Sequence, residues 1–88
     1  MEIINRFFKN GRLEKIPKKL SFKIEIFKEI SKLFTANTTY SEKEVNEILK
    51  EVFNDYAILR RYLVDFKFLD RSKDCRVYTL NEMLENHE

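Results

Sequence analysis

The 88-residue chain has one glycine, one proline, one cysteine, one histidine and no tryptophan. So little glycine and proline disfavours disorder and a loop-rich all-β fold, because turns and disordered segments are usually rich in both. The single cysteine, Cys75, excludes an internal disulfide and a metal site built from several thiolates. No apolar run approaches the roughly 20 residues that cross a bilayer, and the first residues lack the apolar segment of a signal peptide. We therefore expect a cytoplasmic protein without a membrane partner.

Residues suited to catalysis are equally scarce. His87 lies in the C-terminal tail, and no histidine lies near Cys75 in the sequence. Gly11 stands alone, so the chain has no glycine-rich phosphate loop. Acidic pairs such as Glu44 and Glu47 share one predicted helix face, where water solvates them and nothing desolvates them as in a catalytic site. We expect a protein that is not an enzyme, with no catalytic residue, no cofactor and no metal.

Apolar and charged residues are plentiful. Hydrophobic residues make up 43% of the chain and include eight Phe and four Tyr, enough for the core of a single domain over residues 1–88. The net charge is +2, but it is unevenly spread. Residues 1–40 have nine Lys/Arg against four Asp/Glu (+5), and residues 41–88 have eight against eleven (−3). A basic half can favour a polyanion, although solvated lysines on a helix face are the commoner explanation.

Helical periodicity predicts two helices in the N-terminal half. We expect Asn10-Gly11 to end the first helix, with a hairpin turn at this dipeptide as the alternative. An extended stretch follows to Pro17, so that residues 1–17 form an N-terminal helix and arm. A longer helix then covers residues 18–34. The apolar residues at helical spacing are Ile3, Ile4, Phe7 and Phe8 in the first helix, and Phe22, Ile26, Phe27, Ile30, Leu33 and Phe34 in the second.

A polar connection, Thr35–Thr39, leads to the strongest local signal in the sequence. Ser41-Glu42-Lys43-Glu44 is a capping box, with Ser41 as N-cap and Glu44 reaching back to its amide. The helix that it starts ends near Phe53, and Asn54 or Asp55 caps another helix. A connection of about three residues is typical of a helix-turn-helix. The predicted buried residues are Val45, Ile48, Leu49, Val52 and Phe53 in the first helix of this pair, and Leu59, Tyr62, Leu63 and Phe66 in the second.

After Lys67 the apolar pattern changes to the alternation of strands. Phe68–Arg71 and Cys75–Tyr78 are predicted strands around a turn at Ser72–Asp74. A helix-turn-helix followed by a charged hairpin indicates a winged helix. The predicted fold class is α+β, mainly α: a winged helix-turn-helix over residues 18–79 with an extra N-terminal helix and a C-terminal β-hairpin wing. The tail, residues 80–88, can add a helical turn through Leu80, Met83 and Leu84.

Several stretches together resemble a bacterial domain of unknown function, number 2087, which occurs alone or attached to helix-turn-helix transcriptional regulators. The resemblance covers roughly residues 7–79 and implies a winged-helix-like fold in a regulatory context, without a mechanism. This chain fits the stand-alone form. At the wing turn the family tends to have a glycine, where this chain has Asp74-Cys75. The matching stretches are Gly11-Arg12-Leu13 with Ile16-Pro17, YSEKEVNEIL (40–49), DYAILRRYLVDFKFLDR (55–71) and Tyr78.

The second helix of the pair, residues 55–67, is the predicted recognition helix. On a helical wheel, Ala57, Arg61 and Val64 lie opposite its buried face, with Arg60 at the flank. Small residues permit close approach to a major groove, and arginine can bind guanine or phosphate. Tyr56 can donate to a phosphate near the helix start. With residues of the helix end and the hairpin, the DNA-binding candidates are Tyr56, Ala57, Arg60, Arg61, Val64, Lys67, Lys73 and Arg76.

A purely structural role for some of these residues is the alternative. Arg60 and Arg61 can pair with Asp65, or with Glu47 and Glu51 of the preceding helix, as exposed charges commonly do. In the hairpin 68–79, acidic residues dilute the positive field that would follow a DNA backbone. Near the start of the long helix, more cations can bind flanking phosphates, although lysines there are more often solubilising: Lys15, Lys18, Lys19 and Lys23.

These observations predict a winged-helix transcriptional regulator that binds double-stranded DNA with sequence specificity. The alternative is a winged-helix protein–protein interaction module without DNA affinity, because the same fold serves both purposes. The acidic helix 41–53 favours the alternative, and the two arginines of helix 55–67 favour DNA. We expect a homodimer through the N-terminal helix, whose apolar residues exceed what a small monomer easily buries. A separate regulatory protein is a further candidate partner.

Overall fold

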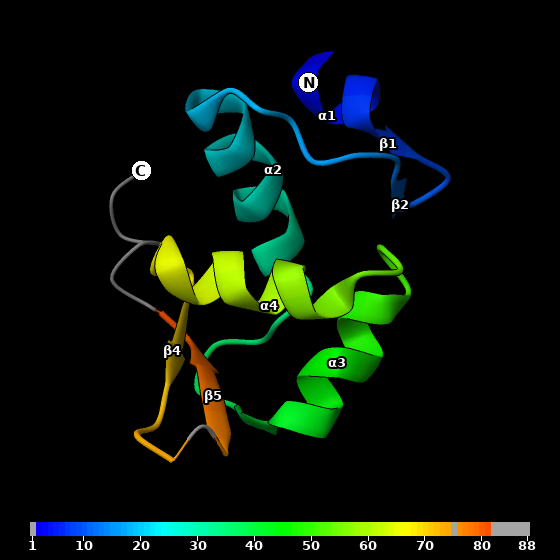
Figure 1. Ribbon diagram of the computed structural model, residues 1–88. Coiled ribbons are helices and arrows are strands. Elements are labelled where there is room, and N and C mark those ends of the chain that lie inside the picture. The colour runs from blue at the N-terminus through cyan, green and yellow to red at the C-terminus, as the bar shows by residue number, and fades with distance from the viewer. Residues whose placement is uncertain (1, 75, 82–88) are drawn as a thin grey trace.

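Four helices and five short strands make up the part of the chain that the computed structural model describes, residues 2–74 and 76–81 (Figure 1). The strands form a two-stranded sheet, β1-β2, and a three-stranded antiparallel sheet in the order β3-β5-β4. From α2 onward the element order is helix, strand, helix, helix and two strands, which is a winged helix. The elements are α1 (Glu2–Phe7), β1 (Phe8–Lys9), β2 (Arg12–Leu13), α2 (Leu20–Ser31), β3 (Thr39–Ser41), α3 (Glu42–Lys50), α4 (Tyr56–Asp65), β4 (Leu69–Arg71) and β5 (Val77–Leu80).

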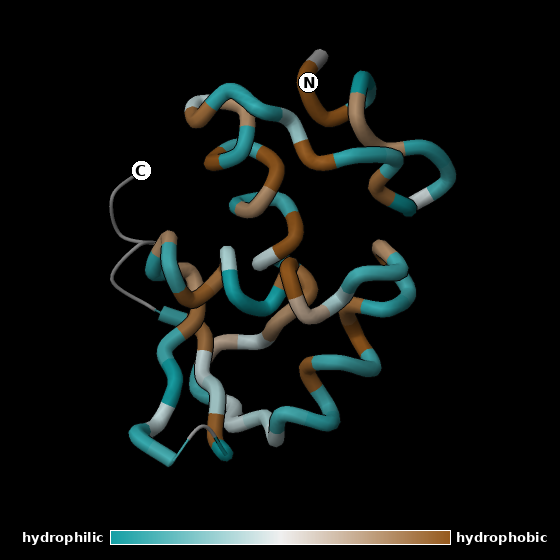
Figure 2. The backbone as a smooth tube through the Cα atoms, in the orientation of Figure 1, coloured by the Kyte–Doolittle hydropathy of each residue, from teal (hydrophilic) through white to brown (hydrophobic). Residues whose placement is uncertain are grey.

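The predicted fold class is confirmed: a mainly helical α+β winged helix-turn-helix with an additional N-terminal helix and a C-terminal β-hairpin wing. Its core lies between α2, α3, α4 and the inner face of the wing. Figure 2 shows hydrophobic and hydrophilic residues alternating in short blocks along α2 and α3, as amphipathic helices require. The buried core residues are Phe7, Leu13, Ile26, Phe27, Ile30, Phe34, Val45, Leu49, Val52, Leu59, Leu63, Phe68, Leu69, Tyr78 and Leu80.

The long helix is shorter than predicted. α2 covers Leu20–Ser31, whereas the periodicity predicted residues 18–34. Leu33 was predicted to be buried, and this is wrong: its exposed fraction is 51%. It follows the helix end, where the chain turns so that Phe34 enters the core instead. The ring of Tyr40 meets the ring of Phe34 edge-on, with 5.1 Å between centroids.

The capping box at the start of α3 is confirmed. The Glu44 N–H donates to Ser41 Oγ at 3.1 Å, and the Ser41 N–H donates to Glu44 Oε1 at 2.8 Å. Ser41 also ends β3, a strand that the sequence analysis treated as a polar connection. β3 pairs with β5, placing Ser41 opposite Val77. The capping box therefore joins α3 to the sheet as well as starting the helix.

Asn10-Gly11 was predicted to end the first helix, and this prediction is wrong. α1 ends at Phe7, and the dipeptide forms the turn of the β1–β2 hairpin, in which Phe8 pairs with Leu13. Asn10 has φ 54° and Gly11 has φ 80°. Two consecutive residues at positive φ make the two-residue turn whose twist matches that of paired strands. The alternative reading of the dipeptide is the correct one.

The wing also differs from its predicted limits. β4 begins at Leu69, and β5 covers Val77–Leu80, two residues later than the predicted strand. In this register Leu69 faces Leu80. Leu80 is thus in a strand. The prediction that Leu80 belongs to a helical turn is wrong. The rest of that turn, Met83 and Leu84, lies outside the described residues.

The apolar residues of the N-terminal segment pack largely against the chain's own core. Phe7 is buried, and its ring lies 6.1 Å from that of Phe22. Ile3, Ile4 and Phe8 are half-buried against the same core. The surplus of apolar surface that led us to expect a homodimer is therefore smaller than the sequence indicates, and the homodimer stays a prediction.

Replacing Ser41 with alanine removes the side-chain acceptor for the Glu44 N–H. We expect Ser41→Ala to lower the free energy of unfolding by about 1 kcal/mol, the usual cost of losing such a cap. The measurement is urea denaturation followed by circular dichroism. The control is Ser21→Ala, inside α2. An unchanged denaturation midpoint for Ser41→Ala would contradict the role of Ser41 as N-cap.

Candidate nucleic-acid interface

α4 is held with one face in the core and the opposite face toward solvent. Asp55 caps it, its Oδ1 accepting from the Ile58 N–H at 3.2 Å. Leu59 and Leu63 are fully buried. Figure 1 shows α4 crossing the front of the molecule, with the wing below it and the N-terminal end of α2 above it. A partner approaching the outer face of α4 would therefore meet these two elements on either side.

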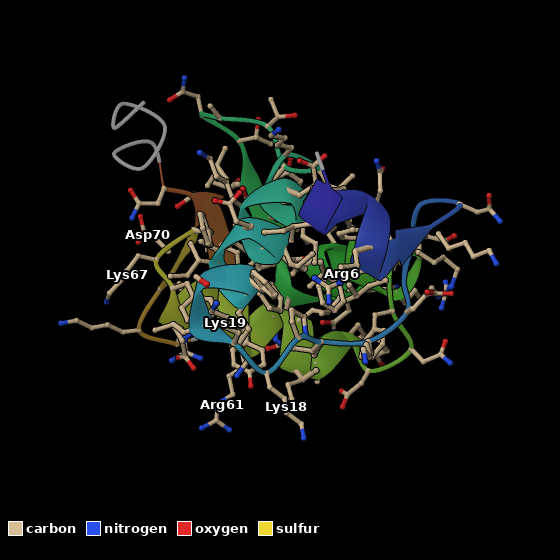
Figure 3. All side chains as sticks on the ribbon, turned by 90° about the horizontal axis from the view of Figure 1, so that it is seen from above. Arg6, Lys18, Lys19, Arg61, Lys67 and Asp70 are labelled. Carbon is tan, nitrogen blue, oxygen red and sulfur yellow. The ribbon has the colours of Figure 1, made fainter. Side chains whose placement is uncertain are left out.

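The outer face of α4 carries Ala57, Arg61 and Asp65, one turn apart and all exposed. The side chain of Arg61 is 82% exposed, and its Nε lies 3.9 Å from Asp65 Oδ2. Such an exposed pair contributes about 0–1 kcal/mol, so this contact does little to restrain the guanidinium. Figure 3 shows Arg61 pointing away from the ribbon. Tyr56, at the start of the helix, is 37% exposed.

Arg60 lies between the two helices of the pair. Its Nη1 donates to Asn46 Oδ1 on α3, and the side chain is half-buried. The acceptor is Asn46, whereas the predicted partners were Asp65, Glu47 or Glu51. Burial raises the pKa of the Tyr78 hydroxyl, and the charge of Arg60 partly opposes this rise. Arg60 thus links α4 to α3, which is a structural role.

Val64 was predicted to face outward, and this prediction is wrong. The side chain is half-buried and packs against the core. The reason is the sharp reversal after α4, where the Lys67 N–H donates to the Val64 carbonyl at 3.0 Å and the Phe68 N–H donates to the Leu63 carbonyl at 2.9 Å. This is the paired bonding of a Schellman motif. Lys67 takes the position at positive φ (68°) that glycine usually occupies, and its side chain is exposed.

Side chains order the tip of the wing. Ser72 Oγ donates to Asp74 Oδ1 at 2.6 Å, and the Arg76 N–H donates to Asp74 Oδ1 at 3.1 Å. The Val77 N–H donates to Ser72 Oγ at 3.1 Å. The hydrogen bonds from Ser72 and from the Arg76 backbone lower the pKa of the Asp74 carboxyl. The turn of the wing is thus closed by the side chains of a serine and an aspartate.

Two exposed cations extend from the wing. Lys73 and Arg76 are both exposed, and Arg76 Nε lies 3.9 Å from Asp74 Oδ2. The structure therefore separates the eight candidate residues. Tyr56 is exposed at the start of α4, Ala57 and Arg61 lie on its outer face, and Lys67, Lys73 and Arg76 are exposed after α4 and on the wing. Arg60 and Val64 belong to the packing between elements.

Arg12 positions α4 and was missed in the sequence analysis. From β2, its Nη1 donates to the Lys50 carbonyl at 3.3 Å and to the Glu51 carbonyl at 3.0 Å, while Nη2 donates to Asn54 Oδ1 at 3.0 Å. The Leu13 N–H donates to the Val52 carbonyl at 2.8 Å. The N-terminal hairpin therefore holds the turn between the two helices of the pair. No local pattern predicts a contact between residues 38 or more positions apart.

A hollow lies over α3. It measures about 440 Å³ and is lined by Tyr40, Glu44, Glu47, Ile48 and Glu51. Three carboxylates thus border a partly apolar floor. This surface suits a basic protein segment and not a polyanion.

Within residues 2–74 and 76–81, the structure has no cluster of three or more His, Cys, Asp or Glu side chains that could hold a metal ion. None of the helices described is both long enough and apolar enough to span a membrane. Cys75 and His87, which the sequence analysis judged unsuited to catalysis, lie outside the described residues.

Fold and site together define a winged helix-turn-helix protein with an exposed second helix. A family model described as an uncharacterised protein conserved in bacteria, domain of unknown function 2087, matches residues 12–80. The chain belongs to this family, and the resemblance noted in the sequence is confirmed. Searches of curated proteins and of solved structures gave no match. The match begins at Arg12, so α1 and β1 lie outside it.

Replacing Arg12 tests its role in positioning α4. We expect Arg12→Ala to lower the free energy of unfolding by about 1–2 kcal/mol, because three acceptors at the end of α3 and in the turn lose a charged donor. Arg12→Lys keeps the charge but not the forked geometry, and it should recover only part of the loss. Thermal or urea denaturation gives the values.

The matched control is Arg76→Ala, which removes another exposed arginine, one that pairs only loosely with Asp74. We expect its effect to stay within about 0.5 kcal/mol, as for most surface substitutions. Equal effects of Arg12→Ala and Arg76→Ala would contradict the role of Arg12.

Proposed function

We propose that this protein is a winged-helix transcriptional regulator that binds double-stranded DNA with sequence specificity. The helix over residues 55–67 enters the major groove, and the hairpin 68–79 follows the sugar–phosphate backbone. The observation that carries the proposal is the outer face of α4. There Arg61 is 82% exposed beside the small residue Ala57, and one weak ion pair restrains it.

The chemistry of this face suits a groove. An arginine can donate two hydrogen bonds to the O6 and N7 atoms of guanine, the commonest specific contact in protein–DNA complexes. Ala57, one turn earlier, leaves room for α4 to approach the bases. Tyr56 lies at the N-terminal end of α4, where its hydroxyl can donate to a phosphate. Asp65 weakens the positive field, and its 3.9 Å separation from Arg61 allows the arginine to exchange this partner for a base.

A protein-docking function is the second candidate, and the hollow on α3 favours it. Glu44, Glu47 and Glu51 surround its partly apolar floor. In this case the protein would be a winged-helix interaction module without DNA affinity, and a partner with basic side chains would dock on α3. The partner could be a separate regulatory protein. The two candidate functions use different faces, so substitutions can distinguish them.

The test of the DNA function is a binding titration with a pool of duplex DNA at low and moderate salt. If Arg61 contacts a base, Arg61→Ala should cost about 1–3 kcal/mol on the preferred sequence and relax the preference at one position. Lys73→Ala, on the wing, should weaken binding to all sequences alike and flatten the salt dependence, because a phosphate contact carries no sequence information. Neither exposed side chain should matter much for stability.

Lys9→Ala is the matched control, because β1 lies at the opposite end of the molecule from the wing (Figure 1). It removes one exposed cation and should leave the sequence preference intact. If the wild-type protein has no affinity for DNA even at low salt, the DNA function is wrong and the docking function on α3 takes its place.

We further propose that the protein acts as a homodimer through its N-terminal segment. An open apolar groove of about 320 Å³ supports the homodimer. The groove lies between α1, β1 and the C-terminal end of α2, and its lining includes Ile4, Phe8 and Leu33. Leu33 is half exposed at the groove. A two-fold dimer would allow Leu33 of each copy to fill the groove of the other, as isologous contacts require.

Sedimentation velocity at micromolar concentration tests the homodimer. We expect the wild-type protein to sediment as a dimer and Leu33→Asp to shift it to monomer. Leu20→Asp introduces the same charge at an exposed leucine of α2, 60% exposed and outside the groove, and should leave the dimer intact. A wild-type protein that stays monomeric up to high concentration would contradict the homodimer.

A further inference from the structure

Cations from two distant parts of the sequence point to the same side of the molecule. Lys18 and Lys19 directly precede α2, and both are exposed. Figure 3 shows Lys18 and Arg61 pointing to the same side of the molecule, although 43 positions separate them in the sequence. The fold thus adds positive charge from the start of α2 to the arginine of α4.

Aromatic contacts fix this arrangement. Lys23 Nζ, on α2, lies 5.2 Å from the centroid of the Tyr62 ring on α4. The Tyr62 ring in turn lies 5.2 Å from that of Phe27, a fully buried residue of α2. Tyr62 immediately follows Arg61, so these contacts hold α2 against the side of α4 that adjoins its outer face. A cation–π contact stabilises the packing most when the ammonium group lies above the face of the ring.

The charge of this region is strongly positive. Lys18, Lys19, Lys23 and Arg61 supply four positive charges against the single negative charge of Asp65 on the outer face of α4. Of the ion pairs between described residues, one involves this group, the loose pair of Arg61 with Asp65. Lys19 Nζ lies 5.1 Å from the Phe22 ring, a contact that leaves its N–H donors available. Exposed ammonium groups are point charges suited to phosphate.

We propose that Lys18 and Lys19 bind the phosphate backbone of the duplex whose major groove α4 enters. This inference rests on the proposed DNA-binding function and adds a second backbone contact to it. The wing lies on one side of α4 and the N-terminal end of α2 on the other (Figure 1). The duplex would then be held on both flanks of α4, by Lys73 and Arg76 on the wing and by Lys18 and Lys19 before α2.

Such contacts leave a defined signature in the salt dependence of binding. Each phosphate neutralised on B-form DNA contributes about 0.9 to the slope of log affinity against log salt concentration. Two contacts therefore contribute about 1.8. Between 50 and 200 mM salt, wild-type affinity should fall about 12-fold more than that of a variant lacking both contacts, on any duplex sequence.

The experiment compares the wild-type protein with the double variant Lys18→Gln/Lys19→Gln. Dissociation constants for a 20-base-pair duplex, preferred or random, are measured from 50 to 200 mM salt. We expect the slope of the double variant to be smaller by about 1.8 on both duplexes, with sequence preference and unfolding midpoint unchanged. The control is Lys9→Gln/Lys32→Gln, which changes the net charge equally through exposed lysines of β1 and the end of α2.

The outcomes separate this inference from the proposed function. If Arg61→Ala weakens binding while Lys18→Gln/Lys19→Gln keeps the wild-type slope, the inference is overturned and the DNA-binding function stands. If the control variant lowers the slope as much as the test variant, the effect belongs to net charge and the inference is again overturned. If the wild-type protein binds neither duplex, both the function and the inference are wrong.

Discussion

The orientation of α4 depends on how the chain between the two helices of the pair is held, and the guanidinium of Arg12 holds it. The last carbonyl groups of a helix have no partner within that helix. Here Arg12 donates to those of Lys50 and Glu51 and to the side chain of Asn54, just before the cap of α4. The N-terminal hairpin that carries Arg12 is pinned to the same turn through the bond from Leu13 to Val52. The angle between α3 and α4 is therefore set from outside the pair.

With that angle fixed, each face of α4 has a distinct environment. Leu59 and Leu63 enter the core, and the Tyr62 ring packs at a tilt against the ring of Phe27 on α2. Arg60 reaches back to Asn46 on α3. The stripe through Ala57 and Arg61 faces solvent. This division explains why two adjacent arginines have different environments: Arg60 joins α3 to α4, and Arg61 is exposed to solvent.

Much of the fold could be predicted from the sequence because its signals are local. A capping box needs four consecutive residues, and Ser41 and Glu44 form the predicted bonds. Amphipathic periodicity likewise located α2, α3 and α4. Asn10-Gly11 suits both a helix end and a hairpin turn, and the helical spacing before it favoured the wrong choice. The three-residue strand β3 is too short to show a period, and it forms only by pairing with β5 far along the chain.

The site was less predictable, because a helical wheel shows which side of a helix is polar but not what lies against it. The wheel predicted that Val64 faces solvent. In the structure the chain reverses at Lys67, and Val64 packs against the core. It also could not show that Asn46 binds Arg60, or that Lys18 points to the same side as Arg61. Contacts of this kind depend on how separate elements pack, and composition carries no trace of them.

The proposed DNA-binding function requires that the outer face of α4, and not the acidic hollow on α3, contacts the duplex. The most direct measurement is the change in backbone amide chemical shifts when a short duplex is added to the isotope-labelled protein. We expect the largest changes at Ala57 and Arg61, at Lys18 and Lys19 and at the wing tip, with little change at Glu44, Glu47 and Glu51. Shifts concentrated on α3, or none at all at low salt, would contradict it.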